Sequence, residues 1–250
     1  MVNFDNKEQK RRLGGLSVKV GIMQPYFFPY IGYWQLIHAV DKYVVYDDVT
    51  YIKGGWINRN NILLGGKKHL VTLPLFGASS FKNINEIEIT PDAIARRKVL
   101  RTLESAYQKA PYFAKVMPMI ERLIMECNKI SELNYRAIKE ICAYIGIDTE
   151  IILSSEMEKD VSLKGVDKVL HINRILGADT YINAPGGKAL YSGEIFADKG
   201  IALRFLEMQD ISYRQYREEF VPGLSILDVL MFNAVTQIRG YLDRYKLAKA

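Results

Sequence analysis

Residues 18–61 constrain the fold of this chain more than any other stretch, because they read as strand, loop, helix and strand in close succession. Residues 18–23 form an apolar run with the length of a buried strand, residues 32–40 have helical periodicity, and residues 43–46 form a second apolar run. Later in the chain, residues 161–206 alternate helix and strand, which argues for parallel pairing with right-handed crossovers. Ligands of parallel sheets bind outside the carboxyl ends of the strands, so we expect the functional site there.

The rest of the chain alternates strands and helices around a helical block at residues 90–146. A pair of glycines between two apolar runs indicates a two-residue hairpin turn. Thr90 and Ser225 are predicted helix caps, with Asp228 in the acidic position of a capping box. The other expected elements are a hairpin at 61–75, strands at 84–89, 150–153, 180–183 and 201–206, helices at 161–176 and 192–199, and a final amphipathic helix at the C-terminus.

These elements predict the α/β fold class: a mostly parallel, Rossmann-like sheet with a helical insertion at about residues 90–146 and a helical C-terminus. Residues 17–250 are expected to form a single domain. Residues 1–16 carry a basic patch but neither the apolar core nor the cleavage site of a signal peptide, so we expect a flexible tail.

Composition limits the class of protein. Hydrophobic residues make up 49% of the 250 residues and charged residues 25%, a balance that can bury a sizeable core. No apolar run approaches the roughly 18 residues of a membrane span, and we expect the protein in the cytoplasm. Cys127 and Cys142 lie in helical segments and are expected as buried thiols, and the scattered histidines predict no metal site. The formal net charge of +6 suits an anionic partner such as a nucleotide, a nucleotide sugar, RNA or a membrane surface.

The loop and helix start after the first strand are typical of an anion site. Backbone N–H groups at a helix N-terminus point at a ligand, and Gly32 there would permit close approach of a phosphate. Tyr30 and Tyr33 flank this point, and their hydroxyls can donate to a phosphate or carry a proton. Gln24, at the end of the strand, is a candidate for binding ligand hydroxyls. The other aromatic residues of the loop are expected to pack as a corner of the core.

Asp47 and Asp48 follow the second strand directly, and one of the two must point away from the core. One interpretation is a turn or a cap, which aspartate favours. The other is a metal carboxylate, an acceptor for a ribose hydroxyl or a general base for an amine. The sequence leaves both interpretations open and does not choose between the two residues.

The polar segment that follows is the most specific local signal in the chain. A tryptophan beside an arginine between two asparagines offers stacking, a bidentate phosphate grip and amide hydrogen bonds to hydroxyls or a base. The alternative is a salt-bridged loop that covers the hairpin. Lys188, in a later glycine-rich turn, is either a second anion contact or a solvated lysine. The candidate binding residues of the segment itself are Lys53, Trp56, Asn58, Arg59 and Asn60.

Nearly the whole chain after the first residues resembles a known family. The stretches that carry the resemblance are GIMQPYFFPYIGYWQLI, DKYVVYDDVTYIKGGWINRNNIL, AYQKAPYF, GADTYINAPGGKALY and FVPGLSILDVLMFN. They resemble the WbqC-like protein family, which is associated with bacterial surface-polysaccharide gene clusters, such as those for the O-antigen of lipopolysaccharide. The resemblance implies a transferase that adds an acyl or aminoacyl group, with glycine as one suggestion, to an amino sugar.

A more distant similarity concerns the fold. The sequence Y-I-G-Y at residues 30–33 is similar to the H-x-G-H signature of nucleotidylyltransferase-like, adenylate-forming Rossmann enzymes, in which the motif grips ATP phosphates. Tyrosines replace both histidines here, and the sequence has no KMSKS-type lysine loop. The similarity therefore implies the fold more than the use of ATP.

The residues and the resemblance together lead to one hypothesis. The protein is an enzyme, an N-acyltransferase, an aminoacyltransferase or an amide-forming ligase, that acts on the amino group of a nucleotide-linked amino sugar. Arg59 and the helix start at Gly32 hold the diphosphate, and Trp56 stacks on the base or the sugar. Asp47 or Asp48 takes a proton from the attacking ammonium, because only the neutral amine is nucleophilic, and a tyrosine of the loop donates to the developing oxyanion.

The donor and cofactor stay open among ATP with magnesium, a coenzyme A thioester and an aminoacyl-tRNA. A tRNA would use the basic surface, including Arg96, Arg97 and Arg101 on a predicted helix. DNA is not an expected partner, and the oligomeric state is open. Two alternatives from other classes remain: a nucleotidyltransferase, which the predicted sheet permits, and a non-catalytic protein that binds a nucleotide sugar or scaffolds a glycan-assembly complex.

Overall fold

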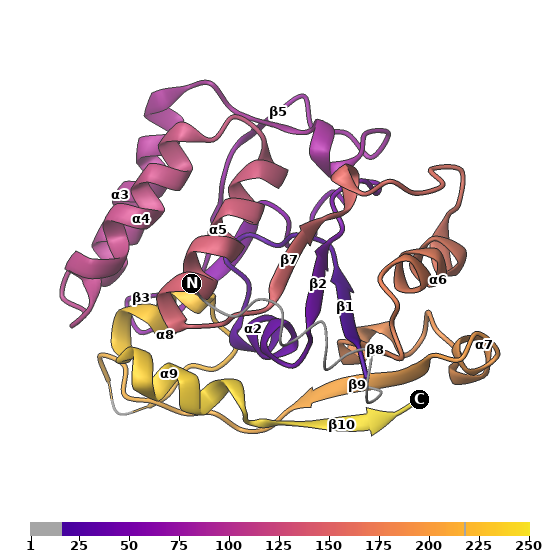
Figure 1. The fold of residues 1–250 in the computed structure, drawn as a ribbon. Coiled ribbons are helices and arrows are strands. Elements are labelled where there is room, and N and C mark those ends of the chain that lie inside the picture. The colour runs from indigo at the N-terminus through magenta and orange to yellow at the C-terminus, as the bar shows by residue number, and fades with distance from the viewer. Residues whose placement is uncertain (1–16, 218) are drawn as a thin grey trace, which may run out of the picture.

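A six-stranded sheet forms the centre of the computed structural model, which describes residues 17–217 and 219–250 (Figure 1). Five neighbouring strands are parallel, and a sixth pairs antiparallel at one edge. The predicted α/β class with a mostly parallel sheet is therefore confirmed. The strands follow each other across the sheet in the order β10 (Tyr245–Lys249), β9 (Ala202–Met208), β8 (Thr180–Asn183), β1 (Lys19–Met23), β2 (Lys42–Val45) and β7 (Glu150–Leu153).

The order of the strands reverses direction at β1. From β1 the chain moves outward to β2 and then β7, and it returns to the other side of β1 to form β8 and β9. The carboxyl ends of β1 and β8 therefore flank the point of reversal, where the connections leave in opposite directions. In open α/β sheets this point is the usual place of a ligand crevice.

Helices cover both faces of the sheet (Figure 1). Successive side chains of β1 point to opposite faces of the sheet. Val20 and Ile22 pack into the core cluster on one face. Gly21 faces the other side, where an added Cβ would lie 3.1 Å from the ring of Tyr43. One face carries α2 (Ile31–His38), α5 (Ile130–Ile145) and α9 (Val235–Leu242), and the other carries α6 (Gly165–Ile175) and α7 (Gly193–Ala197).

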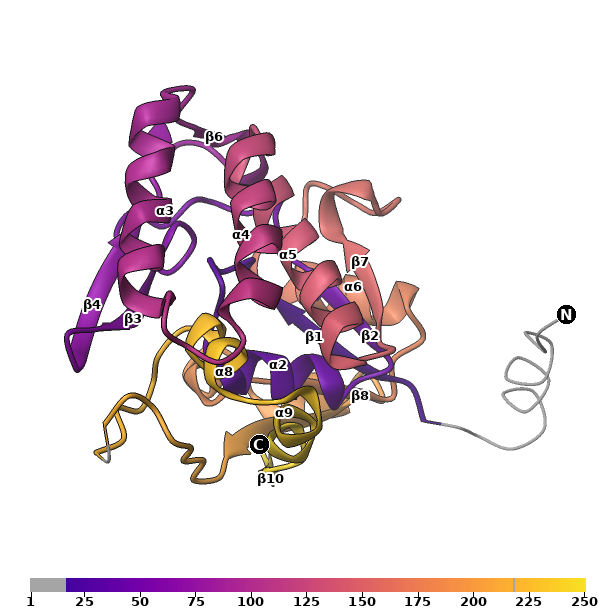
Figure 2. The ribbon, with the colours of Figure 1, turned by 90° about the vertical axis from the view of Figure 1, so that its left-hand side faces the viewer.

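The segment between β2 and β7 holds a hairpin and the predicted helical block. Gly65 and Gly66 have φ values of 62° and 79° and form the two-residue turn of the hairpin, as predicted. The hairpin lies beside the first helix of the block (Figure 2). The elements of the segment are β3 (Arg59–Leu64), β4 (Lys67–Thr72), β5 (Leu75–Phe76), η1 (Ile84–Glu86), β6 (Glu88–Ile89), α3 (Ala93–Tyr107), α4 (Phe113–Glu126) and α5.

Two predicted caps differ in the structure. The residue that caps α3 is Asp92, whose Oδ1 accepts from the backbone N–H of Ile94 at 2.8 Å, so the prediction of Thr90 was wrong by two residues. Ser225 caps α8 (Ile226–Phe232) as predicted. Asp228 does not complete a capping box, because its buried carboxylate accepts hydrogen bonds from other parts of the chain.

Two other segments also differ from the prediction. The expected strand at 84–89 is a short 3-10 helix, η1, followed by the two-residue strand β6. The C-terminal helix ends at Leu242, and residues 245–249 form β10 against β9. Cys127 and Cys142 are buried free thiols, as expected. In the described part of the chain no helix is long and apolar enough to cross a membrane. The predicted tail, residues 1–16, lies outside the described residues.

Candidate functional site

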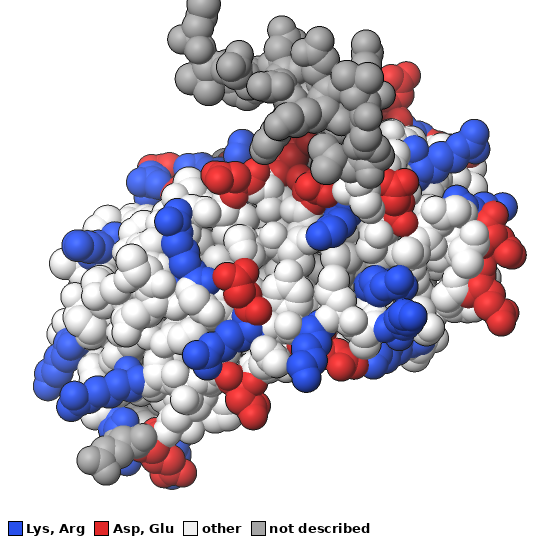
Figure 3. All heavy atoms as spheres, turned by 60° about the horizontal axis from the view of Figure 1, so that its bottom comes forward, with Lys and Arg blue, Asp and Glu red and all other residues white. Residues whose placement is uncertain are grey.

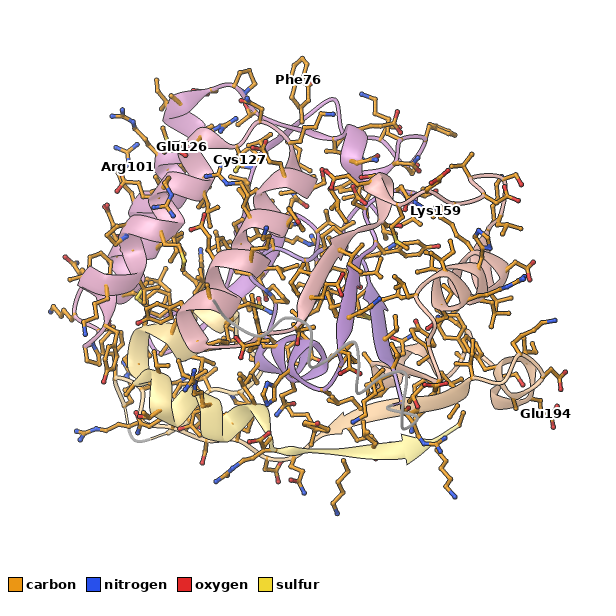
Figure 4. The ribbon with its side chains drawn as sticks, viewed as in Figure 1. Phe76, Arg101, Glu126, Cys127, Lys159 and Glu194 are labelled. Carbon is orange, nitrogen blue, oxygen red and sulfur yellow. The ribbon has the colours of Figure 1, made fainter. Side chains whose placement is uncertain are left out.

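A cluster of charged side chains surrounds Asp48 where β2 and β7 end. Lys159 and Lys168 each place an ammonium 3.0 Å from Asp48 Oδ2, and Lys168 also donates to the Asp48 carbonyl at 2.9 Å. The side chains of Lys159, Lys168 and Asp48 are only 1%, 8% and 14% exposed. Lys159 lies in the segment from η2 (Ser154–Glu156) to α6, beside the ends of these strands (Figure 4). We call these three residues the lysine–aspartate cluster.

The cluster holds Asp48 in its ionised form. Burial raises the pKa of this carboxyl, but the nearby Ser154 hydroxyl and the Lys168 and Lys159 ammoniums outweigh burial, so its pKa lies below the ordinary value. The Lys168 ammonium also lies over the ring of Tyr46, 5.1 Å from the ring centre. Burial raises the pKa of Tyr46, and its phenol therefore stays protonated at neutral pH.

Asp47 has a different environment from Asp48. Its carboxylate is buried and accepts from Ser155, from the backbone N–H at 2.9 Å and from the hydroxyl at 2.7 Å. Burial raises the pKa of Asp47, and the hydrogen bonds from Ser155 oppose the rise. Asp47 thus ties the start of η2 to the end of β2, and Asp48 is the one of the pair that contacts other charged groups.

An aromatic pocket of about 230 Å³ lies beside the N-terminus of α2. Tyr30 and Trp56 remain 38% and 46% exposed there, so both keep ring surface accessible to solvent. The pocket offers flat apolar faces with little charge. Its lining residues are Tyr26, Pro29, Tyr30, Trp56, Asn60 and Gly223.

The backbone that carries the aromatic pocket is strained and held by side chains. Phe28 has a φ of 42°, and it is the non-glycine residue with positive φ in the described part of the chain. Its carbonyl accepts from Asn60 Nδ2 at 2.9 Å and from the Ser225 hydroxyl at 2.6 Å. Asn134 Nδ2 donates to the carbonyl of Pro25, in the same loop, and to the carbonyl of Ile57, in the loop that carries Trp56. It therefore joins these two loops. The walls of the pocket are thus preorganised by buried amides.

Several predicted binding residues have internal partners. Asn58 donates to the Leu73 carbonyl at 2.8 Å and accepts from Tyr51, and Asn60 donates to the carbonyls of Phe27 and Phe28. These amides position the loop, and Asn60 also lines the aromatic pocket.

The tyrosines and the glycine at the start of α2 also have defined neighbours. The Tyr33 hydroxyl is buried and donates to the Gln24 carbonyl at 3.0 Å, and burial raises its pKa. An added Cβ at Gly32 would lie 2.4 Å from the ring of Tyr30. The close approach at Gly32 is therefore that of an aromatic ring, which differs from the phosphate expected from the sequence.

The remaining predicted cations lie apart from one another. Arg59 Nε donates to the Gly55 carbonyl at 3.0 Å, within the loop that carries Trp56, and Lys53 is exposed in that loop. Lys188 pairs with Glu207 at 2.7 Å, in the turn after β8.

The predicted basic helix surface is smaller than the sequence indicates. Arg96 is buried and donates to main-chain carbonyls at the end of α4, so it belongs to the interior, while Arg101 is exposed on α3 (Figure 4). On the face that Figure 3 shows, basic and acidic side chains are interspersed.

Of the predicted site residues, Asp48 belongs to the lysine–aspartate cluster, and Tyr30, Trp56 and Asn60 line the aromatic pocket. The others belong to neither. Sequence reasoning missed Lys159 and Lys168, and Lys168 is 120 positions from Asp48. One signal was available: Lys168 lies on the buried stripe of α6 with Val169 and Ile172, where a lysine needs a partner. In the described ranges no group of three or more His, Cys, Asp or Glu side chains could hold a metal ion.

A second cavity, of about 650 Å³, lies at the opposite, amino-terminal end of β8 and β9. His171, Arg174 and Lys199 line it together with Asp167 and Asp179. None of the predicted site residues lines this cavity.

Comparison with known proteins gives a family. Residues 24–240 match the model of the WbqC-like protein family. The chain is also similar to the uncharacterized protein Rv1507c of Mycobacterium tuberculosis, with 29% identity over 230 residues that cover 90% of this chain and 97% of the mycobacterial protein. No solved structure matches the chain at a significant level.

Proposed function

This chain belongs to the WbqC-like protein family, and from that premise we propose that it is a cytoplasmic enzyme of bacterial surface-polysaccharide biosynthesis. It transfers an acyl or aminoacyl group, such as glycyl, to the amino group of a nucleotide-linked amino sugar. The aromatic pocket is the observation that carries this proposal. Its volume of about 230 Å³ suits a single ring, and Tyr30 and Trp56 offer exposed faces for stacking. Stacking of a base on an aromatic side chain contributes about 1–3 kcal/mol.

The fold in this proposal is Rossmann-like. The five parallel strands, numbered by their order in the chain, follow the sequence 3-2-1-4-5, which is the order of the dinucleotide-binding sheets. The N-terminus of α2 follows the strand at the point of reversal, and the aromatic pocket lies beside it. A nucleotide bound at this edge would follow the general rule for open α/β sheets.

Arg59 is the residue that we assign to the diphosphate. Its Nε is fixed by the Gly55 carbonyl, so the two terminal nitrogens of the guanidinium can form a bidentate pair with phosphate oxygens. An added Cβ at Gly54 would lie 3.4 Å from Arg59 Nη2, which places the guanidinium under the loop that carries Trp56. The ring and the phosphates of one ligand would thus contact the same loop.

Asp48 is the carboxylate that we assign to the amine. Its pKa lies below the ordinary value, so it is ionised at neutral pH. Its Oδ1 has no hydrogen-bond partner among the described residues, so this oxygen is free to accept the proton of the amine as the new amide bond forms. Asp47 is less suitable because Ser155 occupies its carboxylate. The donor is an activated acyl group whose leaving group departs with the electron pair of the broken bond.

Calorimetric titration of the purified protein with nucleotide-linked amino sugars tests the proposal, followed by mass analysis of the mixture with each donor class. Trp56→Ala is expected to weaken nucleotide-sugar binding by tenfold or more, as the loss of one stacking face implies. Ile52→Ala is the matched control, because Ile52 is exposed in the same loop and does not line the pocket.

The outcomes separate the alternatives. A mass gain equal to one acyl or aminoacyl group on the sugar supports the proposal. Binding without any change in mass contradicts it and favours a binding or scaffold protein. Release of pyrophosphate with attachment of a nucleotide favours a nucleotidyltransferase instead.

A further inference from the structure

We infer that Lys159 and Lys168 form a binding site for an oxyanion, the phosphate or carboxylate group of a small ligand, at the carboxyl ends of β2 and β7. Neither lysine belongs to the site predicted from the sequence. The inference does not depend on which group the protein transfers, because it rests only on charge and donor geometry in the lysine–aspartate cluster.

The cluster contains one positive charge in excess. In the described part of the chain, Asp48 is the carboxylate within 4.0 Å of either ammonium. Asp47, the next carboxylate along the chain, is held by Ser155. Removing a charge from water without a partner is costly, and buried charges are normally paired. Two ammoniums that share a single carboxylate therefore favour a second anion.

Each ammonium also has a donor to spare. A lysine ammonium has three N–H donors. Lys159 uses two of them on Asp48 Oδ2 and the Ser154 carbonyl, and Lys168 uses two on Asp48 Oδ2 and the Asp48 carbonyl. Because both nitrogens lie 3.0 Å from the same oxygen, they are at most about 6 Å apart, a spacing that one phosphate or carboxylate group can bridge.

The surroundings preorganise this pair of donors. Lys168 projects from the buried stripe of α6 and its ammonium rests over the ring of Tyr46, which fixes its direction. Lys159 is almost fully buried. Little side-chain entropy is left to lose on binding, so a bound anion would keep most of the gain from its two charged hydrogen bonds.

A purely structural network is the competing explanation, and the wild-type protein separates the two. In a structural network, Asp48 is the partner of both ammoniums and the wild type binds no further anion. In an anion site, the wild type binds the anion, and loss of the competing negative charge in the Asp48→Asn variant raises that affinity further.

Isothermal titration at constant ionic strength is the test, with inorganic pyrophosphate and acetate as the two probes. Wild type is expected to bind one of them. Lys168→Met and Lys159→Met are each expected to weaken that binding by tenfold or more, the loss of a charged hydrogen bond. Lys164→Met is the control, because it removes the same charge from an exposed position next to α6. Asp48→Asn is expected to strengthen binding.

The probes also distinguish the sources of the oxyanion. Binding of pyrophosphate identifies a phosphate site, as in a nucleotide, and binding of acetate alone identifies a carboxylate site. If wild type binds neither probe, or if Lys164→Met is as damaging as Lys168→Met, the inference is wrong. This result would leave the aromatic pocket and its nucleotide-sugar test untouched, because Trp56 and Arg59 are not part of the cluster.

Discussion

Replacing Arg96 by methionine is expected to destabilise the protein strongly, although Arg96 lies among arginines that the sequence offers as an RNA-binding surface. Its side chain is 5% exposed. Nε donates to the Thr90 carbonyl at 2.6 Å, and Nη1 donates to the carbonyls of Ile124, Met125 and Cys127 at 3.0, 3.2 and 2.7 Å. Since α4 ends at Glu126, these last carbonyls have no partner within the helix, and Arg96 acts as a cap for it.

The magnitude follows from these contacts. A hydrogen bond with a charged donor contributes about 1.5–3 kcal/mol, but one guanidinium makes all four, so they do not add. Methionine keeps the apolar stem and leaves the buried carbonyls without a donor. We expect a loss of about 3–5 kcal/mol in the free energy of unfolding, because each buried carbonyl left without a donor costs about 1–3 kcal/mol. This is a large part of the roughly 5–15 kcal/mol of a typical domain.

Urea unfolding measures this loss, followed by far-ultraviolet circular dichroism and by tryptophan fluorescence. Coincident transitions would justify a two-state free energy. Arg97→Met is the matched control, since Arg97 is the exposed neighbour on the same helix and its loss is expected to change stability by less than about 0.5 kcal/mol. A difference between the two variants below about 1 kcal/mol would refute the assignment of Arg96 to the interior.

Two further predictions concern stability. Gly146→Ala is expected to lower the free energy of unfolding in the urea assay by about 1–2 kcal/mol, because Gly146 has a φ of 73° and an added Cβ would collide with the Arg239 guanidinium. Gly240→Ala is the control: Gly240 has open space around it inside α9, so this change should be neutral or stabilising. Burial raises the pKa of Asp228 despite hydrogen bonds from three neighbours. The folded state therefore holds this proton more tightly than the unfolded state, and stability falls as pH rises from about 3.9, the ordinary aspartate value. Asp228→Asn should reduce that fall in a pH series of thermal unfolding, and an unchanged slope would contradict the assignment.

The five parallel strands of the central sheet were accessible from sequence alone. The predicted runs at 43–46, 150–153 and 180–183 lie within a residue of β2, β7 and β8, because a short apolar run between turn signals is a local property. β10 was missed, since its sequence YKLAK is half exposed and its extended state comes from pairing with β9. Pairing of this kind depends on a distant segment, which no local pattern records.

The functional residues also divide into features that the local sequence predicts and features that depend on distant segments. The sequence determined that polar side chains follow β1 and β2 at the carboxyl edge, and that tyrosines and Trp56 gather there. Only the tertiary structure decided their environments: it enclosed Asn58 and Arg96 as internal donors and brought Lys168 from 120 positions away to the carboxylate of Asp48. The chemistry of a side chain depends on its desolvation and on its hydrogen-bond partners, and in this protein segments far apart in the chain supply both.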